Sequence, residues 1–347
     1  MPDYIQANIS YAVVLFLGII GLAFVFKHNF WGPRLRNSFR KPFQLVALCF
    51  TVSFLTIAFL DAFSWKSESL GDNHVLHASQ PRSMLDRVFA LCVDSPEWEY
   101  KEKTFSKPLA TTELFDQNEK LKNRHLCGTT KTGQDTLYLV LKGCKPAITI
   151  GVLPLLFSVP LALLMGIVAG FYGGAWDEFV VYICTTLASI PGLLLLIALI
   201  TALGHGFVQV AVGLGVASFI GLCRLSRAET FKLREMEYIQ AATCLGVPKY
   251  KILLKHIVPN LMHIIIITSI LSFTALVLSE SVLSYLGIGL DGSWGAMIDN
   301  ARTEIAQDPI IWWNIIFASM ALFILVLSVN IVGDTLRDTL DPRTSSE

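Results

Sequence analysis

The chain has 347 residues, of which 53% are hydrophobic and only 16% are charged, and its mean hydropathy is +0.57. Soluble domains carry about 25% charged residues, so this composition argues against a large water-facing surface and indicates a membrane protein. The 27 basic and 27 acidic residues cancel, and this balance gives no support for a nucleic-acid partner.

Seven apolar stretches follow one another along the chain, each close to the ~20 residues that a helix needs to span hydrocarbon. They are Tyr11 to Phe26, Phe43 to Leu60, Ala147 to Phe171, Phe179 to Leu203, Val208 to Cys223, His263 to Leu286 and Ile311 to Val332. The first stretch lacks a basic start and a small-residue cleavage site, so we expect a retained helix rather than a signal peptide. An all-α, polytopic membrane protein is therefore predicted.

The basic residues of the short connections predict the orientation of these helices. Fourteen lysines and arginines lie in segments 27 to 42 and 224 to 262 and in the C-terminal tail, whereas the short connections on the other side carry only Arg302. The long segment 61 to 146 carries 12 basic residues, but loops beyond about 60 residues translocate regardless of their charge. Basic residues favour the cytoplasmic side, so we expect the N-terminus outside and the C-terminus in the cytosol.

A long polar region, residues 61 to 146, separates the second and third stretches. Its length allows a small extracytoplasmic subdomain. It holds Cys92 and Cys127, which either form a disulfide or remain two free thiols. None of the seven cysteines has C-x-x-C spacing and the seven histidines are dispersed, so we expect no metal site.

Prolines and one acidic residue interrupt the apolar stretches. Pro154, Pro160 and Pro191 predict bends, which suit either a translocation pathway or ordinary structural kinks. Glu280 is a charge within a predicted helix, which costs about 2.5 to 3.5 kcal/mol at the bilayer centre. Either it faces a pathway or a partner helix, or the helix ends just before it. Pathway or inter-subunit roles are therefore candidates for Glu280 and Pro191.

Segment 224 to 262 is basic and too polar to cross a bilayer. Gly246-Val247-Pro248 divides it, because glycine commonly follows a helix end and proline is tolerated in the first turn of the next helix. The segment is therefore predicted to form a helix, a sharp turn and a second helix. Four apolar residues after the turn recur at helical spacing and predict one apolar face: Tyr250, Leu253, Leu254 and Ile257.

The letters YIQAATCLG, from Tyr238, and the later KHIVPN resemble the EAA loop of binding-protein-dependent ABC importer permeases of the peptide and nickel branch. Gln240 stands where that family often has glutamate. The resemblance implies that the loop docks in a groove of an ATPase subunit; a helix at the membrane surface without a partner is the alternative. The implied coupling residues are Tyr238, Gln240, Ala241, Ala242, Gly246, Tyr250, Leu253, Leu254, Ile257 and Pro259.

Further matches extend this resemblance from about residue 125 to the end of the chain. They are CGTTKTGQD from Cys127, FYGGAWD from Phe171, SIPGLLLLI from Ser189, ESVLSYLG from Glu280, GSWGAMIDNAR from Gly292 and GDTLRDTLDPR from Gly333. The first of these also suits a simple glycine-punctuated turn. Trp294, Trp312 and Trp313 suit an aromatic belt at the membrane interface. The resemblance implies a six-helix permease core, to which Tyr11 to Phe26 adds an extra N-terminal helix.

Three parts are therefore expected along the chain. Residues 1–42 form the extra transmembrane helix and a basic cytosolic linker, residues 43–146 the first core helix and the long extracytoplasmic region, and residues 147–347 the permease core with its coupling loop, 224–262. No G-x-x-x-x-G-K-[ST] motif occurs, so the chain has no cradle for ATP phosphates. We expect no catalytic residue, no metal and no cofactor.

By resemblance, the chain is a C-type permease subunit of an ATP-driven importer of peptides in a bacterial inner membrane. The implied partners of this chain are ABC ATPase subunits, a second, B-type permease, an extracytoplasmic solute-binding protein and membrane lipid. An ion-coupled secondary transporter or channel is the alternative, and a membrane-bound enzyme built on residues 61 to 146 is a weaker one. Dipeptides, oligopeptides, antimicrobial peptides and nickel chelates all remain open as solutes.

Overall fold

A computed structural model describes residues 41–65, 82–92, 102–115, 120–121, 124–204 and 206–340. The predicted N-terminal helix, Tyr11 to Phe26, lies outside these residues. Most of the described chain is helical, with one short antiparallel ribbon in which Ser64 pairs with Ser83. The described elements before residue 144 are α3 (Pro42–Ala62), β1 (Ser64–Trp65), β2 (Arg82–Ser83), α4 (Met84–Cys92) and α5 (Thr136–Lys142).

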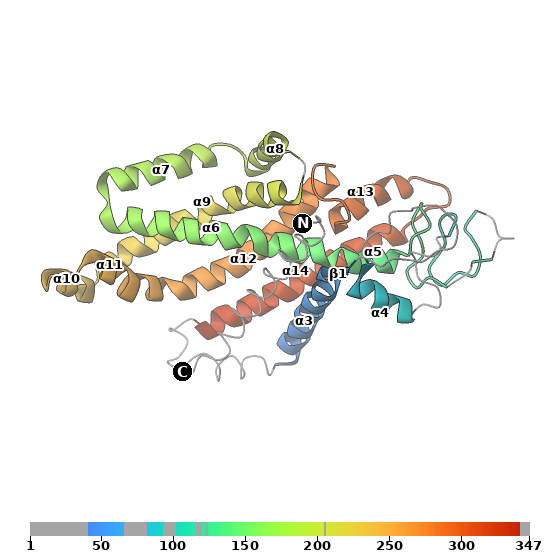
Figure 1. Ribbon diagram of the computed structural model, residues 1–347, viewed down its shortest axis with the longest axis horizontal. Coiled ribbons are helices and arrows are strands. Elements are labelled where there is room, and N and C mark those ends of the chain that lie inside the picture. Colours follow the sequence, from blue (N-terminus) through green and yellow to red (C-terminus); the bar gives the residue numbers. More distant parts are fainter. Residues whose placement is uncertain are drawn as a thin grey trace. The chain divides into compact units, whose positions relative to one another are not determined.

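The remaining described elements are long and short helices in succession (Figure 1). They are α6 (Cys144–Tyr172), α7 (Gly174–Ala188), α8 (Gly192–Leu203), α9 (Phe207–Arg234), α10 (Glu237–Cys244), α11 (Lys249–Ile252), a π-helical turn (Leu253–Ile257), α12 (Val258–Tyr285), α13 (Trp294–Glu304) and α14 (Trp313–Leu340).

Five helical runs in the described part of the chain are long and apolar enough to cross a membrane. They are Pro42–Ala62, Thr136–Tyr172, Phe207–Arg234, Lys249–Tyr285 and Trp313–Thr339. If the bent pair of α7 and α8 is counted as one span, the described part of the chain has up to six candidate membrane spans. The prediction of an all-α, polytopic membrane protein is confirmed, and Pro154 and Pro160 lie inside α6 without ending it.

Two predicted segments differ from the observed helices. The stretch Phe179 to Leu203 is two helices rather than one, because α7 and α8 meet at 92° around Pro191. Proline has no amide hydrogen to continue the helical ladder and disfavours helical geometry in the preceding residue. The stretch that was expected to end at Cys223 continues as α9 to Arg234. The residues after Cys223 are too charged to lie in hydrocarbon, but many of them are good helix formers, so the helix continues.

The contacts divide the structure into two compact units. The first contains Leu45–Thr149 and Ser281–Ser328. Its core includes Trp294, whose indole N–H donates to the carbonyl oxygen of Val140 at 2.9 Å and whose ring meets Phe54 edge-on. Trp313 is also buried, so only Trp312, which is 46% exposed, is available for the predicted aromatic belt. The buried indoles find hydrogen-bond acceptors inside the protein instead.

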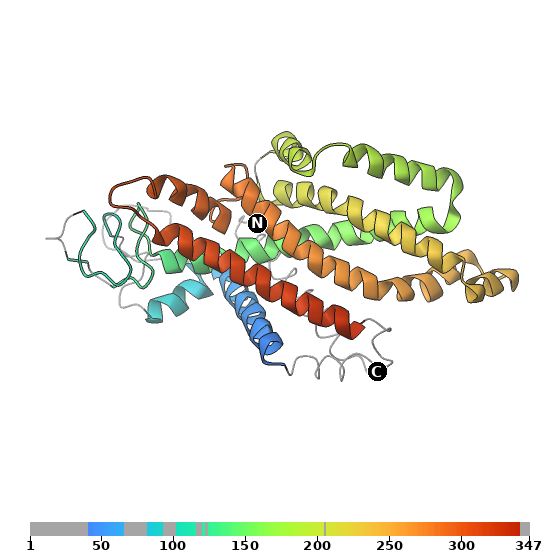
Figure 2. The same cartoon turned by 180° about the vertical axis from the view of Figure 1, so that it is seen from behind.

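The second unit contains Ile150–Glu280 and the chain from Val329 onward. In Figures 1 and 2, α7 runs beside α9 and α6, and α10 and α11 lie where these helices end. Helices α6 and α9 approach closely at Gly170, where an added Cβ would lie 2.7 Å from the carbonyl oxygen of Arg227. Small residues at such crossings allow backbones to approach within van der Waals contact.

Candidate functional site

The two helices α10 and α11 form a tight hairpin, Glu237–Ile252, whose turn follows from its sequence. Gly246 has a φ of +75°, which is accessible to glycine at little steric cost. Its amide donates to Thr243 at 3.1 Å, and the amide of Val247 donates to Ala242 at 3.1 Å. These two bonds are the Schellman pattern of a helix end. The predicted helix, turn and helix are confirmed.

The inner side of this α10–α11 hairpin is a small apolar core. Ile239 and Ile252 of the hairpin and Ile257 just after it are buried together with Ile167 near the end of α6. Burying such a side chain fully contributes about 1.5 to 3 kcal/mol. The hairpin is therefore fixed to the end of α6 by packing, although its charged residues face outward.

The outer side exposes two large apolar residues one helical turn apart. Tyr250 is 66% exposed and Leu254 is 68% exposed. The predicted single apolar face is therefore wrong, because Ile257 is fully buried and Leu253 is half-buried against the inner core. The π-helical turn, Leu253–Ile257, adds one residue to the local turn and so rotates the later residues relative to Tyr250 and Leu254.

The remaining predicted coupling residues lie around the hairpin. The Tyr238 hydroxyl accepts a hydrogen bond from the Asn260 amide at 3.3 Å, and Gln240 donates to the main-chain oxygen of Glu235 at 3.1 Å. Gln240 thus makes a bond within its own chain that a glutamate could not donate. Ala242 packs on the inner core, whereas Ala241 and Pro259 are exposed.

The two predicted pathway residues lie in different settings. Glu280 is 1% exposed, and α12 continues beyond it to Tyr285, which removes the alternative of a helix end in water. Pro191 is exposed at the first position before α8, at the bend described above. The structure therefore does not place Glu280 or Pro191 at the α10–α11 hairpin.

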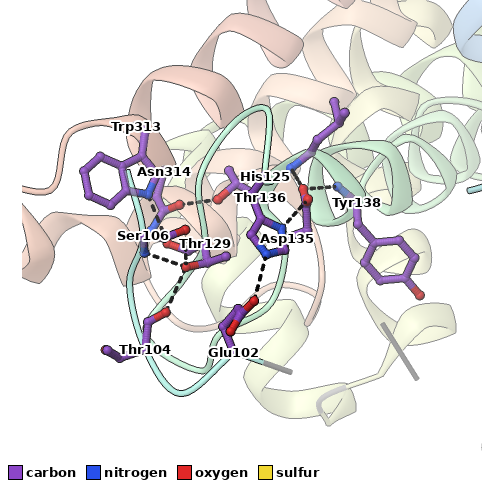
Figure 3. A network of polar contacts seen from close by, with 11 residues as sticks. Glu102, Thr104, Ser106, His125, Thr129, Asp135, Thr136, Tyr138, Trp313 and Asn314 are labelled. Atoms are coloured by element: carbon purple, nitrogen blue, oxygen red, sulfur yellow. Dashed lines mark hydrogen bonds and ion pairs between the residues drawn. The ribbon is translucent and has the colours of Figure 1, made fainter. Parts of the chain in front are cut away.

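A buried polar network, which sequence reasoning did not find, organises the first unit (Figure 3). Asp135 accepts hydrogen bonds from the amides of Leu137 and Tyr138 and so caps α5. Its second oxygen lies 2.8 Å from His125 Nδ1, and His125 Nε2 is 3.7 Å from Glu102. A helix cap of this kind contributes about 1 kcal/mol. The turn predicted from CGTTKTGQD is present, but its aspartate also anchors a helix.

The same network reaches the start of α14. Thr129 Oγ1 donates to the carbonyl oxygen of Thr104 at 2.9 Å, and the Thr129 carbonyl accepts from the Trp313 indole at 3.0 Å. Thr136 donates to Asn314 at 2.6 Å, as the labelled side chains in Figure 3 show. Because buried polar groups need partners, these pairings specify one arrangement of the loop on α14. In the sequence, the indication of this loop was the repeated threonine and glycine residues of CGTTKTGQD.

A second cluster of charges ties β2 and α4 to the helices of the first unit. Lys142 Nζ lies 2.6 Å from Asp61 and 2.7 Å from Asp86. Burial raises the pKa of Asp86, but hydrogen bonds from Lys142, from the Ser83 amide and from Tyr138 outweigh it and leave that pKa below its ordinary value.

The remaining polar groups give no sign of metal or disulfide chemistry in the described part of the chain. Cys127 is a free thiol, and burial raises its pKa to about 11, so it is protonated at neutral pH. In the residues that the structure describes, no group of three or more His, Cys, Asp or Glu side chains is placed to hold a metal ion.

Comparison with known proteins assigns the chain to a family. Residues 162–346 match the sequence profile described as "Binding-protein-dependent transport system inner membrane component", which covers more than half of the chain. The chain therefore belongs to this family and is a multi-pass inner-membrane protein. It is the permease subunit of an ABC importer that works with a separate ATPase and a binding protein. This assignment replaces the alternatives of a secondary transporter, a channel or an enzyme.

Individual relatives are identical at about a third of the residues over roughly two thirds of this chain. The oligopeptide transport permease OppC of Haemophilus influenzae is 32% identical over 63% of this chain and 70% of its own length. The glutathione transport permease GsiD of Pectobacterium atrosepticum is 32% identical over 66% and 76%. OppC of Bacillus subtilis is 31% identical over 67% and 77%. In solved structures, a chain of the MetNI methionine ABC transporter, in an inward-facing conformation, is 17% identical with a TM-score of 0.49, covering 59% of this chain and 98% of that one.

Proposed function

We propose that this permease subunit imports small peptides, the class that includes oligopeptides and glutathione, and that the α10–α11 hairpin receives the ATPase. The proposal that the ATPase docks here is supported by the different character of the two sides of the hairpin. Its inner side is fixed by Ile239, Ile252 and Ile257, whereas Tyr250 and Leu254 protrude into open space. A pair of exposed apolar anchors on a rigid support suits insertion into a groove of a partner.

The flanking charges support the same role. Lys251 and Lys255 are exposed beside the two apolar residues, and Glu229 and Lys232 form an ion pair at 2.7 Å on the preceding helix. Polar groups around an apolar centre are the usual composition of a protein interface. The names of the relatives support small peptides as the solute, because OppC and GsiD are described as carrying oligopeptides and glutathione.

Co-purification tests the docking part. The tagged permease with Tyr250→Ser and Leu254→Ser should retain little ATPase, since losing each anchor weakens an interface by about 1 to 3 kcal/mol. Leu286→Ser is the matched control, because Leu286 is also apolar and 50% exposed but follows the other end of α12. Equal ATPase recovery from the double variant and the parent would rule out this docking surface.

Uptake tests the solute. Cells that carry the complete transporter in place of their own peptide and glutathione importers should accumulate labelled tripeptide or glutathione. An excess of unlabelled peptide should compete with this uptake, and free amino acids should not. Uptake of neither probe, in cells where the ATPase still co-purifies, would contradict the solute class and leave the docking surface intact.

We also propose the orientation that the basic residues favour, with the α10–α11 hairpin in the cytosol, the N-terminus outside and residues 61 to 146 extracytoplasmic. The division at 1–42, 43–146 and 147–347 follows from it. Cys244 of α10 is exposed and suits a test in a background with Cys49, Cys92 and Cys127 replaced by serine. An impermeant maleimide should label Cys244 only in inside-out vesicles, and it should label an Asp291→Cys, Cys244→Ser variant only in right-side-out vesicles. The reverse pattern would overturn the orientation.

A B-type permease is the proposed partner within the membrane, and Glu280 and Pro191 are the proposed pathway or inter-subunit residues. Burial of Glu280 in α12 supports a role within the protein rather than at its surface. Glu280→Gln keeps the shape and removes the charge. It should reduce uptake while the ATPase and the second permease still co-purify, and unchanged uptake would contradict a pathway role.

A further inference from the structure

Asp177 and Arg227 form a two-point ion pair between α7 and α9. Arg227 Nη2 donates to Asp177 Oδ2 at 2.7 Å, and Nε donates to the other carboxylate oxygen. The side chains are 19% and 31% exposed, so water screens the pair only in part. A guanidinium that binds both oxygens of a carboxylate fixes their relative orientation as well as their distance.

The ion pair lies shortly after the turn between α6 and α7, where packing is sparse. Gly173 and Gly174 form this turn with φ values of +65° and +57°. An added Cβ at Gly174 would meet nothing within 4 Å, and at Gly173 only the end of the Arg234 side chain. Glycines in open space leave the backbone free to rotate. The angle between α6 and α7 is therefore not set by the turn itself.

Further along α7, a hydrogen bond between uncharged and charged groups joins the helix to α9 at one point. Arg224 donates to the carbonyl oxygen of Cys184 at 3.1 Å, and the rest of this interface is a cluster of apolar and small residues. Such packing holds two helices together but permits small sliding movements. Because it joins two charged groups at two points, the Asp177–Arg227 pair constrains the register of α7 on α9 more strongly than these contacts do.

The other side of the same turn contacts the α10–α11 hairpin. The Phe171 carbonyl accepts from Arg234 at 3.3 Å, and the Phe171 side chain packs on the core that contains Ile239 and Ile252. Lys249 Nζ lies 5.4 Å from the centre of the Tyr172 ring. The turn between α6 and α7 therefore lies between the hairpin and the ion pair.

We propose that Asp177 and Arg227 are positioning residues that make α7 move together with the α10–α11 hairpin. Movement of the hairpin would then reach α7 and, through it, the bend at Pro191 that leads to α8. This inference rests on the proposed docking of an ATPase at the hairpin. Without the ion pair, α7 turns about Gly173 and Gly174 and no longer follows the hairpin.

A distance measurement between α7 and the hairpin tests the inference without a known solute. Spin labels are placed at Cys244 of α10 and at a Tyr182→Cys substitution on α7, where Tyr182 is 70% exposed. Cys49, Cys92 and Cys127 are replaced by serine in all variants. Pulsed dipolar spectroscopy then gives the distance distribution in the assembled transporter, without nucleotide and with ATP and vanadate. The parent should show one narrow distribution in both states.

The Asp177→Asn variant removes the charge and keeps the side-chain shape. With ATP and vanadate, the ratio of parent-like to displaced distances should fall by about 2- to 30-fold, the range typical of contacts that couple two sites. Arg227→Lys should show part of this effect, because lysine cannot bind both oxygens. Asp299→Asn is the matched control, since it removes one charge of an ion pair with Arg302 that lies within the single helix α13.

The outcomes separate this inference from the proposed function. A distribution in Asp177→Asn as narrow as in the parent, with the ATPase still bound, would overturn the role of the ion pair alone. Failure of the unsubstituted parent to retain the ATPase would instead contradict the docking at the hairpin. If Asp177→Asn does not assemble, the double variant Asp177→Arg, Arg227→Asp, in which the two charges are exchanged, replaces it in the test. A distance distribution as narrow as in the parent would support the role of the ion pair. A distribution as broad as that of Arg227→Lys would contradict this role.

Discussion

The amide of Val247 donates to the carbonyl oxygen of Ala242 across 3.1 Å, and this bond closes the α10–α11 hairpin around Gly246. The bond requires the positive φ of +75° at Gly246. Non-glycine residues adopt that conformation at a cost of roughly 1 to 2 kcal/mol. The exposed Tyr250 is therefore held in place by a turn that only a few residue types can form.

Gly246→Val should open this turn and abolish uptake, because a β-branched residue disfavours the positive φ. The variant should still insert in the membrane, since no atom lies within 4 Å of an added Cβ and the spanning helices are untouched. Uptake and membrane level are measured together. Gly246→Asn is the control, because asparagine tolerates this conformation, and it should retain most uptake. Full uptake by Gly246→Val would count against the coupling role of the hairpin.

Asp86→Asn should lower the stability of the protein by about 1 to 3 kcal/mol at neutral pH, because Lys142 and the Ser83 amide lose a charged acceptor. The folded-state pKa of Asp86 lies below its ordinary value of 3.8. Its contribution is therefore present at neutral pH and is lost as the pH falls through the folded-state pKa. Thermal unfolding in detergent should show a gap between parent and variant that narrows below about pH 4. A gap independent of pH would show that the carboxylate charge is not responsible.

Glu304 should behave in the opposite sense. Burial raises the pKa of this carboxyl above its ordinary value of 4.5, although a hydrogen bond from Asn314 at 2.7 Å opposes the shift. The folded state then binds the proton more tightly than the unfolded state, so stability falls as the pH rises from 4.5 through the folded-state pKa. Glu304→Gln can still accept from Asn314 and should raise the unfolding temperature more at pH 7 than at pH 4. A larger gain at pH 4 would contradict the direction of the shift.

Gly170→Ala should destabilise the packing of α6 on α9. The added Cβ would lie 2.7 Å from the Arg227 carbonyl oxygen, so one backbone has to move, at a cost of about 1 to 3 kcal/mol. Gly192→Ala is the matched control, because nothing lies within 4 Å of a Cβ at that position. Thermal unfolding of the two variants in detergent compares them. Equal unfolding temperatures of Gly170→Ala and Gly192→Ala would contradict this prediction, because they would mean that α6 and α9 accommodate the added methyl group without loss of stability.

Much of the architecture was accessible from the sequence because hydrocarbon imposes simple requirements. Each spanning helix must satisfy its own backbone, so long apolar stretches such as Ala147 to Phe171 marked helices correctly within a few residues. The glycine and proline around Val247 marked the hairpin turn for an equally local reason. The family resemblance rested on such short segments, and the match over residues 162–346 confirms it.

Tertiary structure alone decided which side chains meet. Helical periodicity predicted that Tyr250 and Ile257 lie on one face of a helix. A π-helical turn between them places them on different faces instead. The local sequence carries no pattern that indicates the extra residue in this turn. The pairing of Asp177 with Arg227 joins residues fifty positions apart, as the closing of α7 onto α9 requires. The pattern of apolar and polar residues along a chain indicates which segments are exposed to water, to hydrocarbon or to the protein interior. Specific side-chain contacts depend on how these segments pack against one another.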